Sequence, residues 1–293
     1  MSHPEIPVSI SMRLSTLARN FGLGGRATRQ LLERASALKL PFAPLAAPSQ
    51  AIHLQSGMQL QRLLDLPRSA LSGPVQEDKA LAHAALSKLV TLQERLEESF
   101  DLRKLHGFSG ASPSGEDYLS VEAFAASEAC RHVRIISYKD FVRTLSVALP
   151  RFLAGEPIVL RQTSWNGDCL YWASDVHTEE LACAVGYARV RQLETNLPAQ
   201  ISRYTLNRAA VKALEKDFYV FNMPDAAWQD SAFMSLLLDT GLPYSRLSMN
   251  RTASGNEVLL LPKSSKEANA LGQGLLLAGA PNVTEYLLPL SDA

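Results

Sequence analysis

The chain has 293 residues, of which 46% are hydrophobic and 20% are charged, a composition typical of globular proteins with a sizeable core. Lysine and arginine number 29, as do aspartate and glutamate, so the whole chain has no long-range field that would attract nucleic acid or anionic lipid. Cys130, Cys169 and Cys183 show no CxxC spacing, which indicates reduced thiols and a soluble protein of a reducing, cytoplasmic compartment. No apolar run reaches the roughly 18 residues of a membrane span, and arginines interrupt every candidate leader, so we expect neither a transmembrane segment nor a signal peptide.

Residues 1–40 carry the largest local charge imbalance, with six basic and two acidic side chains and therefore a net charge of +4. Apolar residues recur at helical spacing on both sides of a glycine-rich stretch, which predicts two short amphipathic helices. Such a basic helical arm could bind nucleic acid or an anionic membrane. Its apolar residues Leu31, Leu32 and Leu38 could equally pack on the rest of the protein, so both interpretations stay open. The basic residues are Arg13, Arg19, Arg26, Arg29, Arg34 and Lys39.

Residues 41–108 are expected to form an extended strap followed by a long helix. Three prolines exclude a regular helix from the uncharged stretch 41–61, and its apolar side chains favour a strap across the core. Apolar residues at steps of three and four then predict one helix over residues 76–105. The inward stripe of this helix would comprise Leu81, Ala85, Leu89, Leu92, Leu96 and Phe100.

Small and polar residues at 109–115, SGASPSG, predict a flexible boundary, after which residues 116–293 form one domain. In that domain strand patterns alternate with helical ones, and the segments 157–173 and 244–261 each predict a β-hairpin. Hairpins mixed with helices are typical of α+β proteins with a mostly antiparallel sheet. We therefore expect an α+β fold in which helices pack on β-hairpins, preceded by an N-terminal helical region.

The stretch QTSWNGDCLYWA contains the strongest hairpin pattern of the chain. Asn166 and Gly167 tolerate positive φ and lie between two apolar runs, which predicts a two-residue type I′ turn. That turn would pair Arg161 with Trp172 and place both on one sheet face with Trp165. If this face is exposed, it could bind a base, a sugar or a partner's side chain by stacking. Because tryptophan is highly buried on average, we expect the face to belong to the core.

The same stretch holds a candidate nucleophile, Cys169, directly after Gly167 and Asp168. This run of residues resembles the cysteine motif of the ovarian-tumour deubiquitinases, and Gln162 is similar in placement to the oxyanion-hole glutamine of papain-like proteases. The resemblance implies a cysteine-dependent hydrolase. In those families the general-base histidine lies far downstream of the cysteine, whereas the last histidine of this chain is His177. A hairpin is therefore the favoured interpretation.

Other motifs give no further site. No set of histidines, cysteines and acidic residues has the spacing of a known zinc site, and we expect neither a metal nor a cofactor. Gly272 and Gly274 fall within a helical pattern, where close helix packing explains them better than a phosphate loop does. The leading hypothesis is a non-catalytic interaction or regulatory protein with a protein partner. The alternatives are a hydrolase centred on Cys169 and binding of nucleic acid or an anionic membrane through the basic arm.

Overall fold

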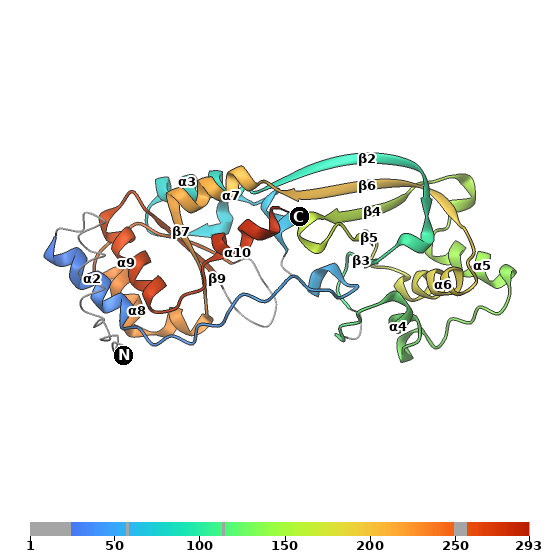
Figure 1. Cartoon of the computed structure of the whole chain (residues 1–293), viewed down its shortest axis with the longest axis horizontal. Coiled ribbons are helices and arrows are strands. Elements are labelled where there is room, and N and C mark those ends of the chain that lie inside the picture. The colour runs from blue at the N-terminus through green and yellow to red at the C-terminus, as the bar shows by residue number, and fades with distance from the viewer. Residues whose placement is uncertain (1–24, 57–58, 113–114, 249–256, 293) are drawn as a thin grey trace, which may run out of the picture. The chain divides into compact units, whose positions relative to one another are not determined.

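The computed structural model describes residues 25–56, 59–112, 115–248 and 257–292. The chain divides into two compact units, each made of separate stretches of sequence. Both units combine helices with a β-sheet, so the α+β class predicted from the sequence is confirmed (Figure 1). None of the described helices is both long and apolar enough to cross a lipid bilayer. Unit 1 comprises Met1–Leu45, Leu66–Ser87 and Ala209–Leu288, and unit 2 comprises Ala46–Asp65, Lys88–Arg208 and Pro289–Ala293.

Unit 1 is built on an antiparallel sheet with the strand order β1-β8-β9-β7. The pair β8 and β9 is the second hairpin predicted from the sequence, and the turn between them lies outside the described residues. Almost every side chain of β9 is buried, so this strand is covered on both faces of the sheet. The strands are β1 (Leu71–Ser72), β7 (Phe218–Met223), β8 (Ser245–Leu247) and β9 (Glu257–Pro262).

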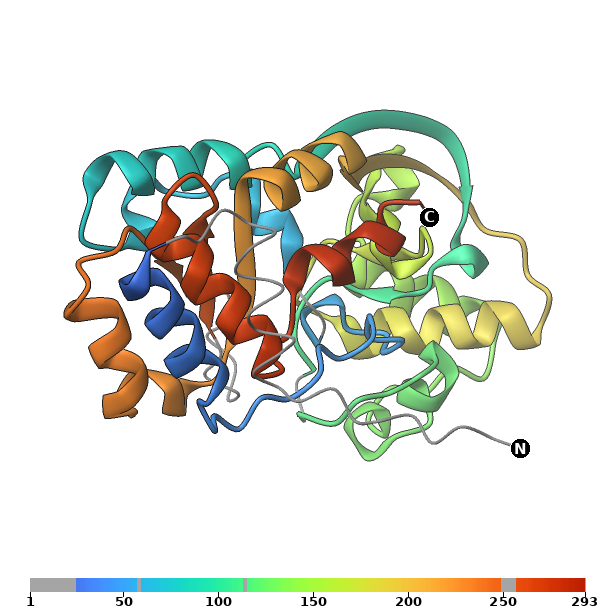
Figure 2. The ribbon, with the colours of Figure 1, turned by 60° about the vertical axis from the view of Figure 1, so that its left-hand side comes forward.

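Two helices of unit 1 pack unusually closely. Helix α2 lies beside α9 in both views (Figure 1 and Figure 2), and its residues Leu31, Leu32 and Ala35 are buried. The close approach depends on Gly274, because a Cβ there would lie 2.4 Å from the Cβ of Ala35. The second predicted helix of the basic arm therefore belongs to the core of unit 1, while the first lies outside the described residues. The helices wholly or mainly in this unit are α2 (Arg26–Ser36), α3 (Gln76–Leu86), α7 (Arg208–Asp217), α8 (Ser231–Leu238), α9 (Lys266–Leu277) and α10 (Val283–Leu290).

Unit 2 is built on a mixed sheet with the strand order β2-β6-β4-β5-β3, whose helices lie on one of its faces (Figure 1). The pairs β2/β6 and β4/β5 are antiparallel, whereas β4/β6 and β3/β5 are parallel. The core lies between this face and the helices. The strands are β2 (Val90–Asp101), β3 (Gly107–Phe108), β4 (Ile158–Thr163), β5 (Leu170–Trp172) and β6 (Asn196–Leu206), and the helices are α4 (Val121–Ala125), α5 (Tyr138–Ala148) and α6 (Thr178–Val190).

The prediction of one long helix over residues 76–105 is wrong beyond the first third of that segment. Helix α3 ends at Leu86, and residues 90–101 form the strand β2. Leu92 and Leu96, which helical spacing placed in a buried stripe, are exposed. The backbone of this segment pairs with β6 from Val90 to Asp101 across one irregularity, and this pairing overrides the helical preference of its glutamates and leucines. The predicted boundary at residues 109–115 lies within unit 2, and the three-part division stays a prediction.

The first predicted hairpin forms, but with a different turn. Strand β4 pairs with β5 so that Leu160, not Arg161, lies opposite Trp172. A short 3₁₀ turn, η7 (Ser164–Asn166), follows β4, and the two residues with positive φ are Gly167 at 66° and Asp168 at 57°. This one-residue shift puts Arg161 on the sheet face opposite to that of Trp172.

Asp168 explains the shifted turn. Its carboxylate accepts two hydrogen bonds from the guanidinium of Arg203, at 2.7 Å from Nη2 and 3.2 Å from Nε. Its backbone carbonyl accepts a hydrogen bond of 2.7 Å from the side-chain amide of Gln162. These three bonds hold Asp168 in the left-handed conformation, which aspartate tolerates better than most residues do.

Candidate functional site

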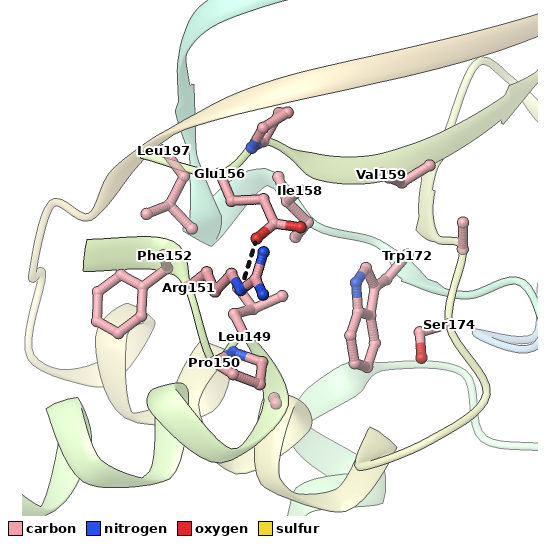
Figure 3. Close-up of a pocket in the computed structure, with 13 residues that line it drawn as sticks. Leu149, Pro150, Arg151, Phe152, Glu156, Ile158, Val159, Trp172, Ser174 and Leu197 are labelled. Atoms are coloured by element: carbon pink, nitrogen blue, oxygen red, sulfur yellow. Dashed lines mark ion pairs between the residues drawn. The ribbon is translucent and has the colours of Figure 1, made fainter. Parts of the chain in front are cut away.

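Unit 2 contains a cavity of about 540 Å³ beside the C-terminal end of α5 (Figure 3). Its volume lies within the range of sites that hold small ligands or single anchor side chains. The walls come from the end of α5, the 3₁₀ turn η6 (Phe152–Ala154), the start of β4, the end of β5 and the start of β6. The apolar side chains that line it include Leu149, Phe152, Ile158, Trp172 and Leu197.

Local sequence signals shape the wall that α5 contributes. Ser137 and Asp140 form a capping box at the start of the helix, in which each side chain accepts a hydrogen bond from the other residue's backbone N–H. The helix stops at Leu149, whose φ of −125° and ψ of 76° are not helical, because the residue before a proline avoids the helical region. Gly155, with a φ of 76°, then turns the chain toward β4.

Trp172 forms one side of the cavity. Its side chain is on the helix-covered face of the sheet, and the residue as a whole is only 4% exposed. The ring of Phe108 meets it edge to face with 6.5 Å between the ring centroids, which fixes the orientation of the indole. Trp172 is therefore a preformed wall of the cavity, and an apolar group that enters would contact it without a rearrangement of the core.

The polar groups of the cavity are few and lie at its exposed side. Arg151 and Glu156 form a long ion pair, 3.7 Å from Nε to Oε2, with side chains that are 78% and 56% exposed. In the view of Figure 3 this pair lies between Phe152 and Trp172. An exposed pair of this length contributes little to stability, so either side chain is available to move when a ligand binds.

The other predicted binding residues lie elsewhere. Arg161 is opposite Tyr171 on the far face of the sheet, so the predicted stacking of Arg161 on Trp172 does not form. Trp165 is in the turn η7, is 4% exposed, and has a buried indole nitrogen without a hydrogen-bond partner among the described residues. The structure thus separates the three residues, and of these only Trp172 borders the cavity.

Cys169 lies just before β5 in surroundings that favour the neutral thiol. Burial raises the pKa of Cys169, and the nearby carboxylate of Asp168 raises it further, while a hydrogen bond with Tyr171 opposes them. His106 lies on the neighbouring segment, where its Nδ1 accepts a hydrogen bond of 3.2 Å from the backbone N–H of Leu170. Burial and the charge of Arg189 lower the pKa of His106. Because the Nδ1 lone pair of His106 already accepts this backbone hydrogen bond, that nitrogen is not free to take a proton from the thiol of Cys169.

Gln162 also takes a structural position. Its amide nitrogen donates to the carbonyl of Asp168 and so closes the loop of the hairpin, whereas an oxyanion hole needs a donor directed at an open substrate site. Among the described residues, no group of three or more histidine, cysteine, aspartate or glutamate side chains could hold a metal ion.

Residues 95–293 match the model of a family described as a family of unknown function, DUF6685. The chain belongs to this family. The match to DUF6685 includes the cavity, the hairpin with Cys169 and the whole of β9 and α9, whereas α2 and α3 precede it. No curated protein and no solved structure matches the chain.

Proposed function

We propose that this protein is a non-catalytic interaction protein and that its cavity receives an apolar side chain from a partner protein. The observation that carries the proposal is the cavity itself, a preformed apolar space bordered by Trp172 and Phe152. Buried aromatic and aliphatic anchors that fill such spaces supply most of the binding energy in many protein interfaces.

Apolar side chains around the cavity favour a protein partner over a small molecule. Leu149 and Phe152 line the cavity and are only half-buried. Val147 and Leu153, which are 40% and 77% exposed, adjoin the lining residues Ala148 and Phe152 in sequence. A ligand held wholly inside the cavity would leave these side chains in water, whereas a partner's chain that lies across the mouth would cover them.

The two alternatives have weaker support. A hydrolase centred on Cys169 needs a thiolate near neutral pH, and the surroundings of this thiol oppose one. Binding through the basic arm needs free cations, yet Arg29 pairs with Glu33 at 3.1 Å and Arg34 donates to Ser235 at 3.0 Å.

Selection from a displayed library of random peptides, followed by measurement of the affinity of the enriched peptides, tests the proposal. We expect the enriched peptides to share an aromatic or long aliphatic residue. The variant Leu149→Lys places a charge at the wall of the cavity and should weaken their binding about tenfold or more, since an unpaired charge there opposes apolar contact.

The matched control is Leu119→Lys, the same substitution at a leucine that is 74% exposed two residues before the start of α4. It should leave the affinity unchanged. Circular dichroism checks that both variants fold. The proposal fails if no peptide is enriched, or if the enriched peptides bind Leu149→Lys as tightly as they bind the unaltered protein.

A further inference from the structure

The α-helices of unit 2 lie on one face of its sheet and leave part of the other face open. Leu160 of β4 and Ile201 of β6 point toward the helices and belong to the core (Figure 1). Side chains alternate between the two faces along each strand, so Arg161 and Ser202 point away from that core. Strand β2 adds Glu94, which is paired with Ser202, to the same side of the sheet.

Two rows of side chains cross this open face, each made of one residue from β2, one from β6 and one from β4. Because neighbouring strands lie about 4.8 Å apart, the backbones of the two outer residues of a row are separated by about 9.6 Å. The first row is Glu94, Ser202 and Arg161, and the second row is Leu96, Gln200 and Val159.

The outer residues of the first row carry opposite charges that remain unpaired. Neither Glu94 nor Arg161 forms an ion pair or a side-chain hydrogen bond with another residue that the structure describes. The outer residues of the second row are aliphatic, and Leu96 is 77% exposed while Val159 is 43% exposed. A sheet face that is exposed to water usually carries polar side chains, so these two suggest a face that is covered in solution.

A second copy of this chain fits both rows through a two-fold rotation. An axis that is parallel to β6 and passes above Ser202 places β2 of the second copy over β4 of the first, and β4 over β2. This rotation keeps each residue at its level along the strands. Glu94 of either copy therefore lies over Arg161 of the other, and Leu96 lies over Val159. Stacked sheets pack about 10 Å apart with nearly aligned strands, a separation that a glutamate and an arginine together span.

We propose that this protein forms a two-fold symmetric dimer through the open face of the unit 2 sheet, with an ion pair between Glu94 of each copy and Arg161 of the other. Two ion pairs and two contacts between Leu96 and Val159 then surround the axis. An unrelated partner would need its own acid and base at matching positions, whereas a second copy supplies them by symmetry. Trp172 is on the opposite face, so the dimer is independent of partner binding at the cavity.

The mass of the full-length protein in solution tests the dimer. Size-exclusion chromatography with light scattering should give twice the 32.0 kDa of one chain at high concentration, and this mass should fall on dilution. Glu94→Arg and Arg161→Glu each place like charges opposite one another at both ion pairs. Either variant alone should therefore be monomeric at concentrations at which the unaltered protein is dimeric.

Mixing the two variants tests the pairing itself. In the mixed dimer, Glu94→Arg supplies two positive charges and Arg161→Glu supplies two negative ones, so both ion pairs form again. We expect the equimolar mixture to recover the dimer, which would also exclude misfolding as the cause of its loss. The matched control is Lys139→Glu, a charge reversal at an exposed lysine of α5, and it should leave the dimer intact.

Three results would overturn the proposal. The first is an unaltered protein that stays monomeric at every concentration up to about 1 mM. The second is a single variant, Glu94→Arg or Arg161→Glu, that dimerises as tightly as the unaltered protein, since the copies would then meet through another surface. The third is an equimolar mixture of the two variants that remains monomeric.

Discussion

Replacing either of two buried helical glycines by alanine should change the free energy of unfolding in opposite directions. Gly274 in α9 and Gly186 in α6 both lie in helix interiors and are both buried. Alanine is the better helix former by about 1 kcal/mol, so Gly→Ala stabilises a helix wherever the added methyl group has room. What separates the two positions is the distance from the new methyl to the neighbouring helix.

At Gly274 the methyl would lie 2.4 Å from the Cβ of Ala35 and 2.8 Å from the carbonyl oxygen of Leu32. Carbon atoms in contact are usually about 3.5–4.0 Å apart, so α2 would have to withdraw by about 1 Å. A backbone oxygen cannot swing aside as a flexible side chain can. Overpacking costs about 1–3 kcal/mol, and contacts this short belong to the upper part of that range, about 2–3 kcal/mol. After the gain of about 1 kcal/mol in helix propensity, we expect Gly274→Ala to lower the free energy of unfolding by about 1–2 kcal/mol.

At Gly186 the nearest atom would be the Cβ of Ala125 at 3.7 Å, an ordinary contact. Gly186→Ala should therefore raise the free energy of unfolding by about 0.5–1 kcal/mol. The expected free energies of unfolding of the two variants therefore change by amounts that differ by about 2 kcal/mol, although the substitution is the same.

Urea denaturation followed by circular dichroism and tryptophan fluorescence measures both variants. Because the chain has two compact units, each variant is compared with the unaltered protein in the transition of its own unit. Trp228 reports on unit 1, whereas Trp165 and Trp172 report on unit 2. If Gly274→Ala is as stable as the unaltered protein, or if both variants change stability in the same direction, α2 is not seated against α9 as described.

Three further changes test the hairpin, its cysteine and the predicted boundary. Gly167→Val should cost about 1–2 kcal/mol in urea titrations because φ is 66° there, whereas Gly167→Asn should cost a few tenths, and equal costs would argue against the left-handed turn. Since burial raises the pKa of Cys169, its rate of reaction with iodoacetamide should rise only above the pH at which free cysteine reacts, and fast selective labelling at pH 6 would restore the hydrolase alternative. Limited proteolysis should cut first within residues 109–115, and the two fragments should stay associated because β2 and β3 pair with strands that follow the cut. A first cut elsewhere would remove that boundary.

The sequence predicts elements well where local pattern and tertiary packing agree. The spacing of Leu31 and Leu32 predicts the buried face of α2, and the capping residues around Ser137 lie where α5 begins. The segment around Leu92 and Leu96 shows the opposite case, because its glutamates and leucines suit a helix while its partner strand β6 is about 100 residues away. A pairing over that distance leaves no local signal in one sequence.

The candidate site was harder to predict than the fold. Asn166 and Gly167 predict the hairpin, but its register depends on the hydrogen bond from Arg203 to Asp168, which joins residues 35 positions apart. A shift of one residue then moved Arg161 to the other face. The cavity collects residues from well-separated stretches of chain, and among its lining residues the sequence pointed to Trp172 alone.

The most direct test of partner binding at the cavity is the indole N–H signal of Trp172. The chain has three tryptophans, so ¹⁵N-labelled protein gives three indole signals that single Trp→Phe variants assign. On addition of a peptide selected by the protein, the signal of Trp172 should move, while those of Trp165 and Trp228 should stay in place because neither lines the cavity. A bound peptide that leaves the Trp172 signal unchanged would contradict the proposed function.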